Sequence, residues 1–398
     1  MIAAARSASD AVEAARDLVP LLRANAAALD AEAAFPAENL EALRSSGLLG
    51  LMVPVEAGGL GGTSATLAAV CRVLGEGCMS TALIYGMHCQ QVGVVADHAD
   101  DSLRARVLDR IGAGALYVAS VTSERGKGGH LLTAQAPLAP AGEGWRLERD
   151  APVVTGGAHA DAFLVTMRRD PAAPPSEVAL VWAKRSELEV EVTSGWDPLG
   201  ARGTHSVGLR LAGEVPADHV VGDRFHDVAV SSMIPLGHIA WAASWLGAAT
   251  GVYREMVGLF RDPASRRGFD VTSDLFATHL ARIRMQLSTV SAFLASTVAA
   301  YEQIRGLAGT SPAPYEEPAF QLQINDLKVL ASETLFSGVD RLLELSGLRY
   351  GYMRTAPVPL ERVFRDLRSA SLMYANERLL IANGKLALLD RDVTLAGS

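Results

Sequence analysis

Histidine is the residue type in this sequence that is best suited to proton transfer at neutral pH, because its ordinary pKa is about 6.5. His238 lies in a long apolar segment, and His88, His130 and His205 are weaker candidates of the same kind. No two histidines form a metal-binding pattern such as HExxH. The three cysteines have no CxxC spacing, so we expect neither a disulfide framework nor a zinc site. His238 could therefore act as an acid or base, or be a satisfied histidine in a buried helix.

A glycine-rich segment, SVTSERGKGGH at residues 120–130, could approach a ligand closely. Gly126, Gly128 and Gly129 would let the backbone come near a bound group. A strand edge with N–H groups and one hydroxyl suits a heteroaromatic ring whose rim alternates acceptors and a donor. The alternative interpretation is an ordinary glycine loop.

The charge and hydropathy patterns exclude several classes of protein. Acidic residues outnumber basic ones by 44 to 36, and the basic residues are scattered, so no nucleic acid partner is expected. The N-terminus has early charges and no apolar core with a cleavage site, so we expect no signal peptide. Residues 233–252 are poor in charge but contain Pro235 and Ser244, which favours a buried helix over a membrane span. A cytoplasmic protein that does not contact membranes is predicted.

These candidate residues must be positioned by three successive parts of the chain. A length of 398 residues predicts two or three domains. Residues 1–117 show a helical period, residues 118–228 contain short apolar segments separated by Pro, Gly and charged clusters, and the helical period returns over residues 229–398. The strands expected in the middle part include residues 163–167, 178–182 and 188–192.

A repeating apolar pattern in the last part predicts a helical bundle. Leu280, Leu287 and Leu294 recur every seven residues, and Ile283 and Val290 are offset by three. Such a narrow stripe is typical of helices that pack side by side. We expect long antiparallel helices that also pack between subunits.

Five segments, in chain order, resemble the acyl-CoA dehydrogenase family. The segment at residues 196–206 is the most specific, because it is similar to the family's W-x-x-LG-x-RGT-x-S run at every fixed offset. The resemblance covers almost the whole chain. It implies an α+β, mostly α, fold with an N-terminal all-α domain (1–117), a middle β-barrel or β-sandwich domain (118–228) and a C-terminal four-helix bundle (229–398). The five segments are SVTSERGKGGH (120–130), PVVTGGAHAD (152–161), WDPLGARGTHS (196–206), RRGFD (266–270) and LERVFRDLRSASLMYANERLL (360–380).

The resemblance implies a flavin cofactor, which is FAD, or FMN if the protein is a two-component monooxygenase. In such proteins an arginine at the position of Arg266 reaches the pyrophosphate of a flavin held by a neighbouring subunit, where its planar guanidinium suits two phosphate oxygens. A homo-oligomer, either a dimer or a homotetramer, is therefore implied. The flavin contacts carried over from the family are Thr122, Ser123, Gly128, Gly129, Thr155, Arg266, Phe269 and Gly347.

The substrate side is less well defined by the resemblance. Arg202 and Thr204 are implied to support substrate or flavin geometry, and His88 is a further candidate for substrate contact. Arg365 and Asp366 match the family's R-x-x-RD helix, where their implied role is structural.

The family's usual catalytic base is missing. Dehydrogenation of an acyl thioester needs a carboxylate that removes a proton beside the carbonyl. The family supplies a Glu from one of two places, which here fall on Tyr374 and near Gly237 and His238. Glu377 follows Tyr374 by three residues and could replace the base if one loop changes its length. The candidate catalytic residues are therefore Glu377, His238 and Tyr374.

Three functions fit these patterns. On overall resemblance, the first is an acyl-CoA or acyl-carrier-protein dehydrogenase with a displaced base, which forms an α,β double bond and passes electrons to an electron-transfer flavoprotein. The second is a flavin monooxygenase or N-hydroxylase of the same fold, which uses O2 and flavin reduced by a flavin reductase. The third is a non-catalytic member that binds flavin or an acyl thioester. In each case the ligand would be a small molecule or a thioester, and the sequence leaves its identity open.

Overall fold

The N-terminal part of the protein is a layer of helices. The computed structural model describes residue 5, residues 7–126 and residues 130–395. Polar caps begin several of these helices: Thr63 accepts hydrogen bonds from two N–H groups of the first turn of α3, and Asp100 caps α5. The helices are α1 (Ala11–Glu32), α2 (Ala37–Ser45), α3 (Ser64–Gly77), α4 (Met79–His98) and α5 (Asp101–Gly112).

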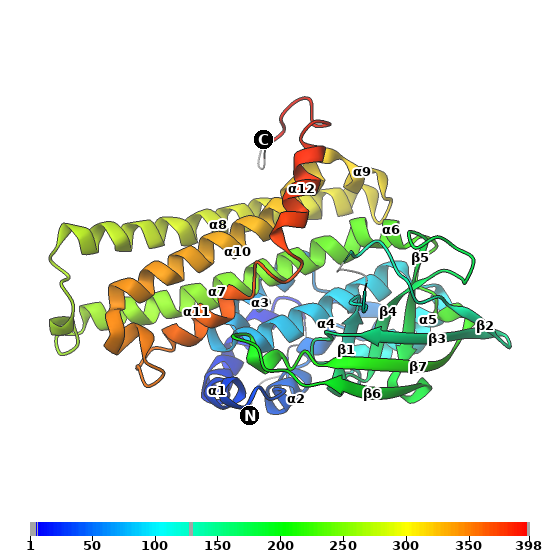
Figure 1. The fold of residues 1–398 in the computed structure, drawn as a ribbon, viewed down its shortest axis with the longest axis horizontal. Helices are drawn as coiled ribbons and strands as arrows, with labels where there is room; N and C mark the ends of the chain where they lie inside the picture. The colour runs from blue at the N-terminus through cyan, green and yellow to red at the C-terminus, as the bar shows by residue number, and fades with distance from the viewer. Residues whose placement is uncertain (1–4, 6, 127–129, 396–398) are drawn as a thin grey trace.

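The middle part forms two small sheets at one end of the molecule (Figure 1). In the first sheet, of order β1-β4-β5, β1 pairs with β4 in parallel and β4 with β5 in antiparallel fashion. The second sheet is antiparallel, of order β2-β3-β7-β6. The strands are β1 (Val118–Val121), β2 (Ala139–Ala141), β3 (Gly144–Ala151), β4 (Ala162–Arg168), β5 (Val178–Lys184), β6 (Leu188–Ser194) and β7 (Gly208–Pro216).

Long helices extend away from the sheets to the opposite end of the molecule (Figure 1). A short helix and one π-helical turn, Ala229–Met233, lead from the sheets into α7. Ile283, Leu287 and Val290 are buried in α8, as the seven-residue pattern predicted. The helices are α6 (Phe225–Val228), α7 (Ile234–Arg261), α8 (Asp274–Ala308), α9 (Ala313–Glu316), α10 (Pro318–Gly347), α11 (Leu360–Arg368) and α12 (Asn376–Leu386).

Two glycines let α3 and α7 cross closely, and this contact joins the N-terminal layer to the bundle. A Cβ added at Gly75 would lie 2.3 Å from the Ser244 carbonyl oxygen, and one added at Gly247 would lie 2.0 Å from the Arg72 carbonyl oxygen. Both distances are shorter than any real Cβ contact, so only glycine permits this crossing. The first half of α7 is thereby buried against the N-terminal helices.

The fold class expected from the sequence is confirmed, with helices before and after two small sheets. The three strands predicted from apolar segments lie within β4, β5 and β6. Residues 234–252 lie within α7 and are mostly buried. No helix in the described ranges is long and apolar enough to cross a membrane.

Candidate active site

Ser123 stands just after β1 and links this strand to the segment after β3. Its Oγ donates a hydrogen bond to the Val153 carbonyl oxygen at 2.6 Å and accepts one from the Val153 N–H at 3.3 Å. Val153 itself is exposed. Thr122 and Ser123 therefore lie at one edge of the β domain, while the predicted contacts Gly128 and Gly129 lie outside the described residues.

A buried ion pair between Arg149 and Glu124 stabilises the backbone at this edge. Arg149, which is fully buried on β3, lies 2.9 Å from the Glu124 carboxylate. Its Nε donates to the Ser123 carbonyl oxygen at 3.1 Å, and its Nη2 donates to the Thr166 hydroxyl at 3.0 Å. The Ser123 carbonyl oxygen thus accepts a hydrogen bond from Arg149, and the Glu124 carboxylate balances the charge of that arginine.

Three hydroxyl groups form a chain that begins at Thr155, two residues after Val153. The half-buried Thr155 hydroxyl lies 3.0 Å from the Ser206 hydroxyl, which lies 2.8 Å from the Thr204 hydroxyl. Thr204 also donates to the Ala201 carbonyl oxygen. His205, between them in sequence, has a positive φ of 44°, and its buried Nδ1 has no hydrogen-bond partner among the described residues. The second and third segments of the resemblance therefore meet in space.

Arg202 is tied to the C-terminal end of α1. Its guanidinium donates to the carbonyl oxygens of Asp30 at 2.6 Å, Pro198 at 2.9 Å and Ala31 at 3.4 Å, and it also pairs with the Asp197 carboxylate. Because these contacts occupy the guanidinium, they favour a structural role for Arg202. A substrate contact by Arg202 or by the buried Thr204 stays a prediction.

The loop at residues 196–206 docks onto α11, which joins the β domain to the bundle. The carboxylate of the buried Asp366 accepts a hydrogen bond from the Ala201 N–H at 2.7 Å, and burial raises the pKa of Asp366 to about 6. Arg365 donates to the Leu199 carbonyl oxygen and pairs with the Asp30 carboxylate at 2.7 Å. These contacts give Arg365 and Asp366 a structural role at this junction.

His238 lies in the helical side of the candidate site, on α7. It is 4 % exposed, and its Nδ1 donates to the Ile324 carbonyl oxygen of α10 at 3.0 Å. Burial, and to a lesser extent the charge of Lys328, lower the pKa of His238 to about 4. The imidazole is therefore neutral near pH 7, and its Nε2 carries a lone pair rather than a proton. Its ring lies 5.6 Å from that of Trp241, whose indole N–H has no partner in the described ranges.

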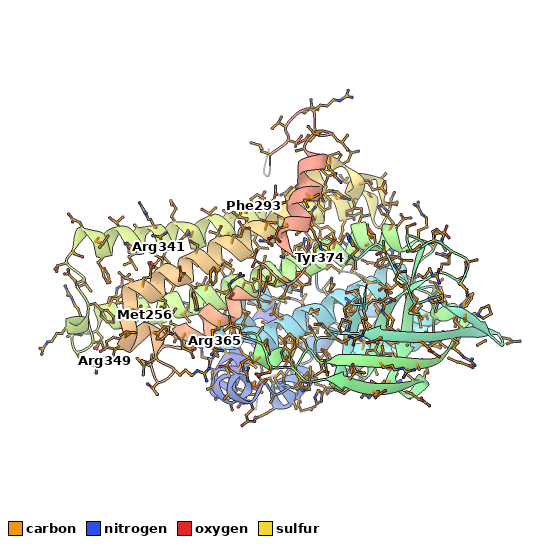
Figure 2. All side chains as sticks on the ribbon, in the orientation of Figure 1. Met256, Phe293, Arg341, Arg349, Arg365 and Tyr374 are labelled. Atoms are coloured by element: carbon orange, nitrogen blue, oxygen red, sulfur yellow. The ribbon has the colours of Figure 1, made fainter. Side chains whose placement is uncertain are left out.

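Tyr374 occupies the segment between α11 and α12, which passes in front of α7 and α10 (Figure 2). Its φ is 55°, a left-handed conformation that is uncommon for a residue with a side chain. Lys328 of α10 donates to the Tyr374 carbonyl oxygen at 2.8 Å and to Asn376 Oδ1 at 2.6 Å. Glu377 stands in the first turn of α12 and is exposed.

His88 has both ring nitrogens engaged with the backbone. Its Nε2 donates to the Leu49 carbonyl oxygen at 2.9 Å, and its Nδ1 accepts from the Val118 N–H at 3.0 Å. Burial lowers its pKa to about 4. These contacts tie α4 to the start of β1 and leave neither nitrogen for a substrate, so they favour a structural histidine.

Three predicted flavin contacts gather at the end of the bundle that is far from the β domain (Figure 1). Phe269 packs on Tyr350, with ring centroids 4.8 Å apart, and Gly347, with a φ of 63°, ends α10. Arg266 is exposed in the turn between α7 and α8, and no ion pair of its guanidinium occurs among the described residues. One subunit therefore does not bring Arg266 near Ser123, and the role of Arg266 toward the flavin of a neighbouring subunit stays a prediction.

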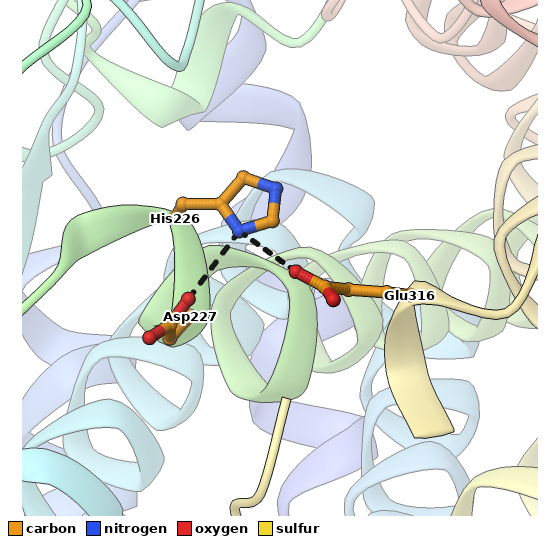
Figure 3. Close-up of side chains that lie close together, drawn as sticks. All are labelled: His226, Asp227 and Glu316. Atoms are coloured by element: carbon orange, nitrogen blue, oxygen red, sulfur yellow. Dashed lines mark hydrogen bonds and ion pairs between the residues drawn. The ribbon is translucent and has the colours of Figure 1, made fainter. Parts of the chain in front are cut away.

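A cluster of His226, Asp227 and Glu316 lies away from these residues, between α6 and α9 (Figure 3). His226 Nδ1 is 3.4 Å from an Asp227 oxygen and 3.3 Å from a Glu316 oxygen. Arg224 reaches within 3.7 Å of the same Asp227 oxygen. The groups are partly exposed and Arg224 lies beside Asp227, so we interpret the cluster as a surface network of polar contacts.

A cavity of about 550 Å³ opens between α1, α7 and α11, on the other side of the docked loop. Gly203 and Asp366 line it, whereas Ser123, Thr155, His238 and Tyr374 do not. The carboxylates that line this cavity are held by arginines, as Glu76 is by Arg254 and Glu255 by Arg23, or by the backbone, as Asp366 is. The cavity therefore touches two segments of the resemblance, at Gly203 and Asp366, but does not include the predicted flavin contacts Ser123 and Thr155 or the candidate catalytic residues His238 and Tyr374.

Sequence reasoning missed Lys328, Asn376 and Arg149. A single lysine on an amphipathic helix and a single arginine on a strand are ordinarily exposed, so no local pattern marks them as buried. The whole chain has only four lysines, and Lys328 lies between two apolar residues in the run LKV. This apolar flanking is the signal in the sequence that could have drawn attention to Lys328.

The chain matches two parts of one family in protein comparisons. Residues 9–115 match "Acyl-CoA dehydrogenase, N-terminal domain", and residues 239–376 match "Acyl-CoA dehydrogenase, C-terminal domain". The cyclohex-1-ene-1-carbonyl-CoA dehydrogenase of Syntrophus aciditrophicus is 27 % identical over 60 % of this chain and 57 % of that protein. The amino sugar nitrososynthase DnmZ of Streptomyces peucetius is also 27 % identical, over 89 % of this chain and 87 % of that protein.

Solved structures show the same fold. FMN-bound TdsC from Paenibacillus sp. A11-2, a dibenzothiophene monooxygenase, has a TM-score of 0.84 and 21 % identity, covering 98 % of this chain and 99 % of that one. The two family matches lie on either side of the β domain, and the segments of the resemblance meet at the edges of that domain and the bundle. The chain belongs to the acyl-CoA dehydrogenase superfamily.

Proposed function

We propose that this protein is a flavin-dependent monooxygenase of the acyl-CoA dehydrogenase superfamily, which uses reduced flavin and O2 to oxygenate a small molecule. The observation that carries the proposal is the absence of a suitable base on the helical side of the site. The residue at the family's base position is Tyr374, and no carboxylate of the described chain is hydrogen-bonded to it or to His238.

The groups that replace the base are poor proton acceptors for a carbon acid. A general base works best when its pKa lies near the working pH. Burial lowers the pKa of His238 to about 4, and burial raises the pKa of the Tyr374 phenol above its usual range. A neutral imidazole and a neutral phenol suit hydrogen bonding to an oxygenated substrate better than removal of an α-proton.

The β-domain edge fits the flavin ring. The Ser123 proton is donated to the Val153 carbonyl oxygen and the Thr155 hydroxyl is paired with Ser206, so both oxygens can still accept a hydrogen bond there. The Nδ1 of His205, which lies between Thr204 and Ser206 in sequence, has no partner among the described residues. Reduced flavin would supply two electrons, so that one atom of O2 enters the substrate and the other leaves as water. If the cofactor is FAD, Arg266, Phe269 and Gly347 of a neighbouring subunit would hold its far end. FMN would not need them.

Relatives of both kinds align over nearly the whole chain: the dibenzothiophene monooxygenase of Mycolicibacterium goodii and the short-chain specific acyl-CoA dehydrogenase of Clostridium acetobutylicum each cover 91 % of it. The relatives therefore permit an oxygen-using function without selecting it. A flavin reductase would then be the partner that delivers reduced flavin.

The second candidate is a dehydrogenase with Glu377 as the displaced base. It is favoured by the place of Glu377 in the first turn of α12, where its charge acts on Lys328 and helps to keep that ammonium protonated. In this case an acyl thioester would be the substrate, and an electron-transfer flavoprotein would accept the electrons.

The deciding experiment begins without oxygen. Flavin-loaded protein is mixed with a panel of acyl-CoAs, and the oxidised flavin band at about 450 nm is followed. Reduced protein is then exposed to ¹⁸O2 with candidate substrates, and the products are analysed by mass spectrometry. We expect no bleaching by any thioester and one ¹⁸O atom in the product.

Bleaching by a thioester that is lost in Glu377→Gln and kept in Glu56→Gln would replace the monooxygenase with the dehydrogenase. Glu56 is a matched control, because it is an exposed glutamate in a helical turn far from the site.

A further inference from the structure

The helical side of the candidate site contains a fully buried lysine. Lys328, in the middle of α10, is 0 % exposed, and its ammonium touches only neutral oxygens, those of Tyr374 and Asn376. No carboxylate is paired with it in the described part of the chain. Burying a charge without an ionic partner is unfavourable, so such a residue persists where its hydrogen bonds are needed.

One of these bonds holds the unusual backbone of Tyr374. The left-handed φ of 55° brings Cβ close to the backbone and is disfavoured for an aromatic residue. The carbonyl of the same residue accepts the ammonium hydrogen bond at 2.8 Å. A charge-assisted bond of this kind compensates the unfavourable backbone conformation.

The other bond holds the beginning of α12. Asn376 is the first residue of this helix and is buried. Its Oδ1 accepts from Lys328 at 2.6 Å, and its Nδ2 donates to Ser332 Oγ at 3.1 Å and to Glu333 Oε1 at 2.9 Å. Residues of α10 therefore hold both sides of the Asn376 amide.

The charged and titratable groups around Lys328 come from three helices. Glu333 of α10 and Glu377 of α12 favour its ammonium form, and His238 of α7 is affected by its charge. Burial is the larger influence and lowers the pKa of Lys328 to about 8. Near pH 7 the ammonium form therefore predominates.

We propose that Lys328 is a positioning residue of the active site, whose ammonium fixes Tyr374 and Asn376 against α10 and so sets the position of Tyr374 and the start of α12. The link to catalysis rests on the proposed function. The local ordering does not, because it is measured without turnover.

The first test is hydrogen–deuterium exchange of the flavin-loaded oligomer over residues 369–380. Lys328→Met keeps the length and apolar stem of the side chain but removes its donors, and we expect exchange in this segment to become at least tenfold faster. Lys385→Met is the matched control, because it removes a lysine charge from an exposed position of α12. Exchange rates within twofold of the parent in Lys328→Met would overturn the proposal.

Asn376→Ala provides a second variant if Lys328→Met does not fold. It removes one of the two acceptors and leaves the Lys328 to Tyr374 bond, so we expect a smaller acceleration than in Lys328→Met. An unchanged exchange rate at residues 376–380 in Asn376→Ala would also count against the proposal.

The second test separates positioning from packing. In Lys328→Ala, added methylammonium can occupy the space of the lost side chain and restore slow exchange at residues 369–380, whereas Lys328→Met leaves no room for it. Lys328→Met should also raise the pKa of His238, read by NMR of labelled histidine, while Lys385→Met should not. If methylammonium does not restore slow exchange and the pKa of His238 does not rise, Lys328 contributes only through the packing of its side chain. If the exchange results hold but no oxygenated product forms, the proposed function fails and the positioning role stands.

Discussion

The β-domain side of the candidate site presents neutral hydroxyl groups beside a buried charge that is balanced by a carboxylate, Arg149 with Glu124. The helical side is organised around Lys328, a buried charge that has no carboxylate partner in the described part of the chain. Ser123 and Thr155 are held by residues of the same domain, through Val153 and Ser206. Tyr374 is held by Lys328, which is 46 positions away in sequence on another helix. The side chains of the first side are therefore positioned by contacts within the β domain. Those of the second side are positioned by the packing of α7, α10 and α12.

This difference bears on the reaction. The partly buried hydroxyl groups of Ser123 and Thr155 can hydrogen-bond a ring without changing any protonation state. Burial on the helical side instead keeps His238 neutral. Under the proposed function, the first side would bind the flavin and the second a substrate that needs no strong base.

The largest expected effect tests whether the β-domain side also depends on a buried charge. Arg149→Met leaves Glu124 buried without its cation and should lower the free energy of unfolding by about 3 kcal/mol. Arg146→Met, on the same strand, removes an exposed pair with Glu214 and should change the free energy of unfolding much less, because solvent screens that pair. Urea unfolding of both variants measures the difference. Equal losses would show that burial does not distinguish these two pairs.

The junction between the two sides should make stability depend on pH. Burial raises the pKa of Asp366 to about 6, so between about pH 4 and pH 6 the folded state binds more protons than the unfolded state. The contribution of Asp366 to the free energy of unfolding is therefore present at low pH and is lost as the pH rises through about 6. Asp366→Asn keeps an acceptor for the Ala201 N–H and should remove this dependence, which amounts to at most about 3 kcal/mol.

Chemical unfolding of the parent protein and Asp366→Asn at pH 4 and pH 7 measures this contribution. The parent should lose more stability than the variant between the two values. Parallel losses would mean that Asp366 does not titrate in this range.

The next comparison concerns the end of the bundle that is far from the β domain. A substitution there should weaken the binding only of a cofactor that is long enough to contact two subunits. Arg266→Met should weaken FAD binding about tenfold through the loss of charge-assisted hydrogen bonds, and leave FMN binding unchanged. Arg267→Met, in the same exposed turn, is the control. Titrations followed by flavin fluorescence measure both affinities. Equal weakening of FAD and FMN would place Arg266 outside the role proposed for it.

The smallest effect concerns the hydroxyl row itself. Thr155→Val keeps the shape of the side chain and removes one neutral donor, so flavin affinity should fall about fivefold. Thr193→Val, on the exposed side of β6, should leave it unchanged. The same fluorescence titration measures both variants. An unaltered affinity in Thr155→Val would remove this hydroxyl from the flavin site.

Local patterns were sufficient for the elements of the fold. Apolar segments at residues 163–167, 178–182 and 188–192 became strands, and the stripe containing Leu287 and Val290 became the buried face of α8. Such patterns report the burial of one face of one element, which depends on neighbours in sequence. The resemblance also singled out Ser123 and Thr155, because both belong to short runs with fixed offsets, and their role as flavin contacts stays a prediction.

The same patterns could not decide which polar side chains are available to a ligand. Arg202 and His88 are engaged with carbonyl groups of α1 and of the turn at Leu49, which sequence spacing does not reveal. Their assignment as substrate contacts remains a prediction, and the observed hydrogen bonds favour a structural role for both residues. The mutual positions of Arg266 and Ser123 likewise depend on the length and direction of the bundle.

The sequence by itself determined the order of helices and strands, the superfamily and the missing glutamate at Tyr374. Only the tertiary structure decided that Lys328 is buried and donates to the carbonyl oxygen of this tyrosine, and that burial lowers the pKa of His238. The physical reason is that hydropathy along the chain reflects the average environment of a face, whereas the charge state and the hydrogen bonds of one side chain depend on the groups that distant segments bring within a few ångströms of it.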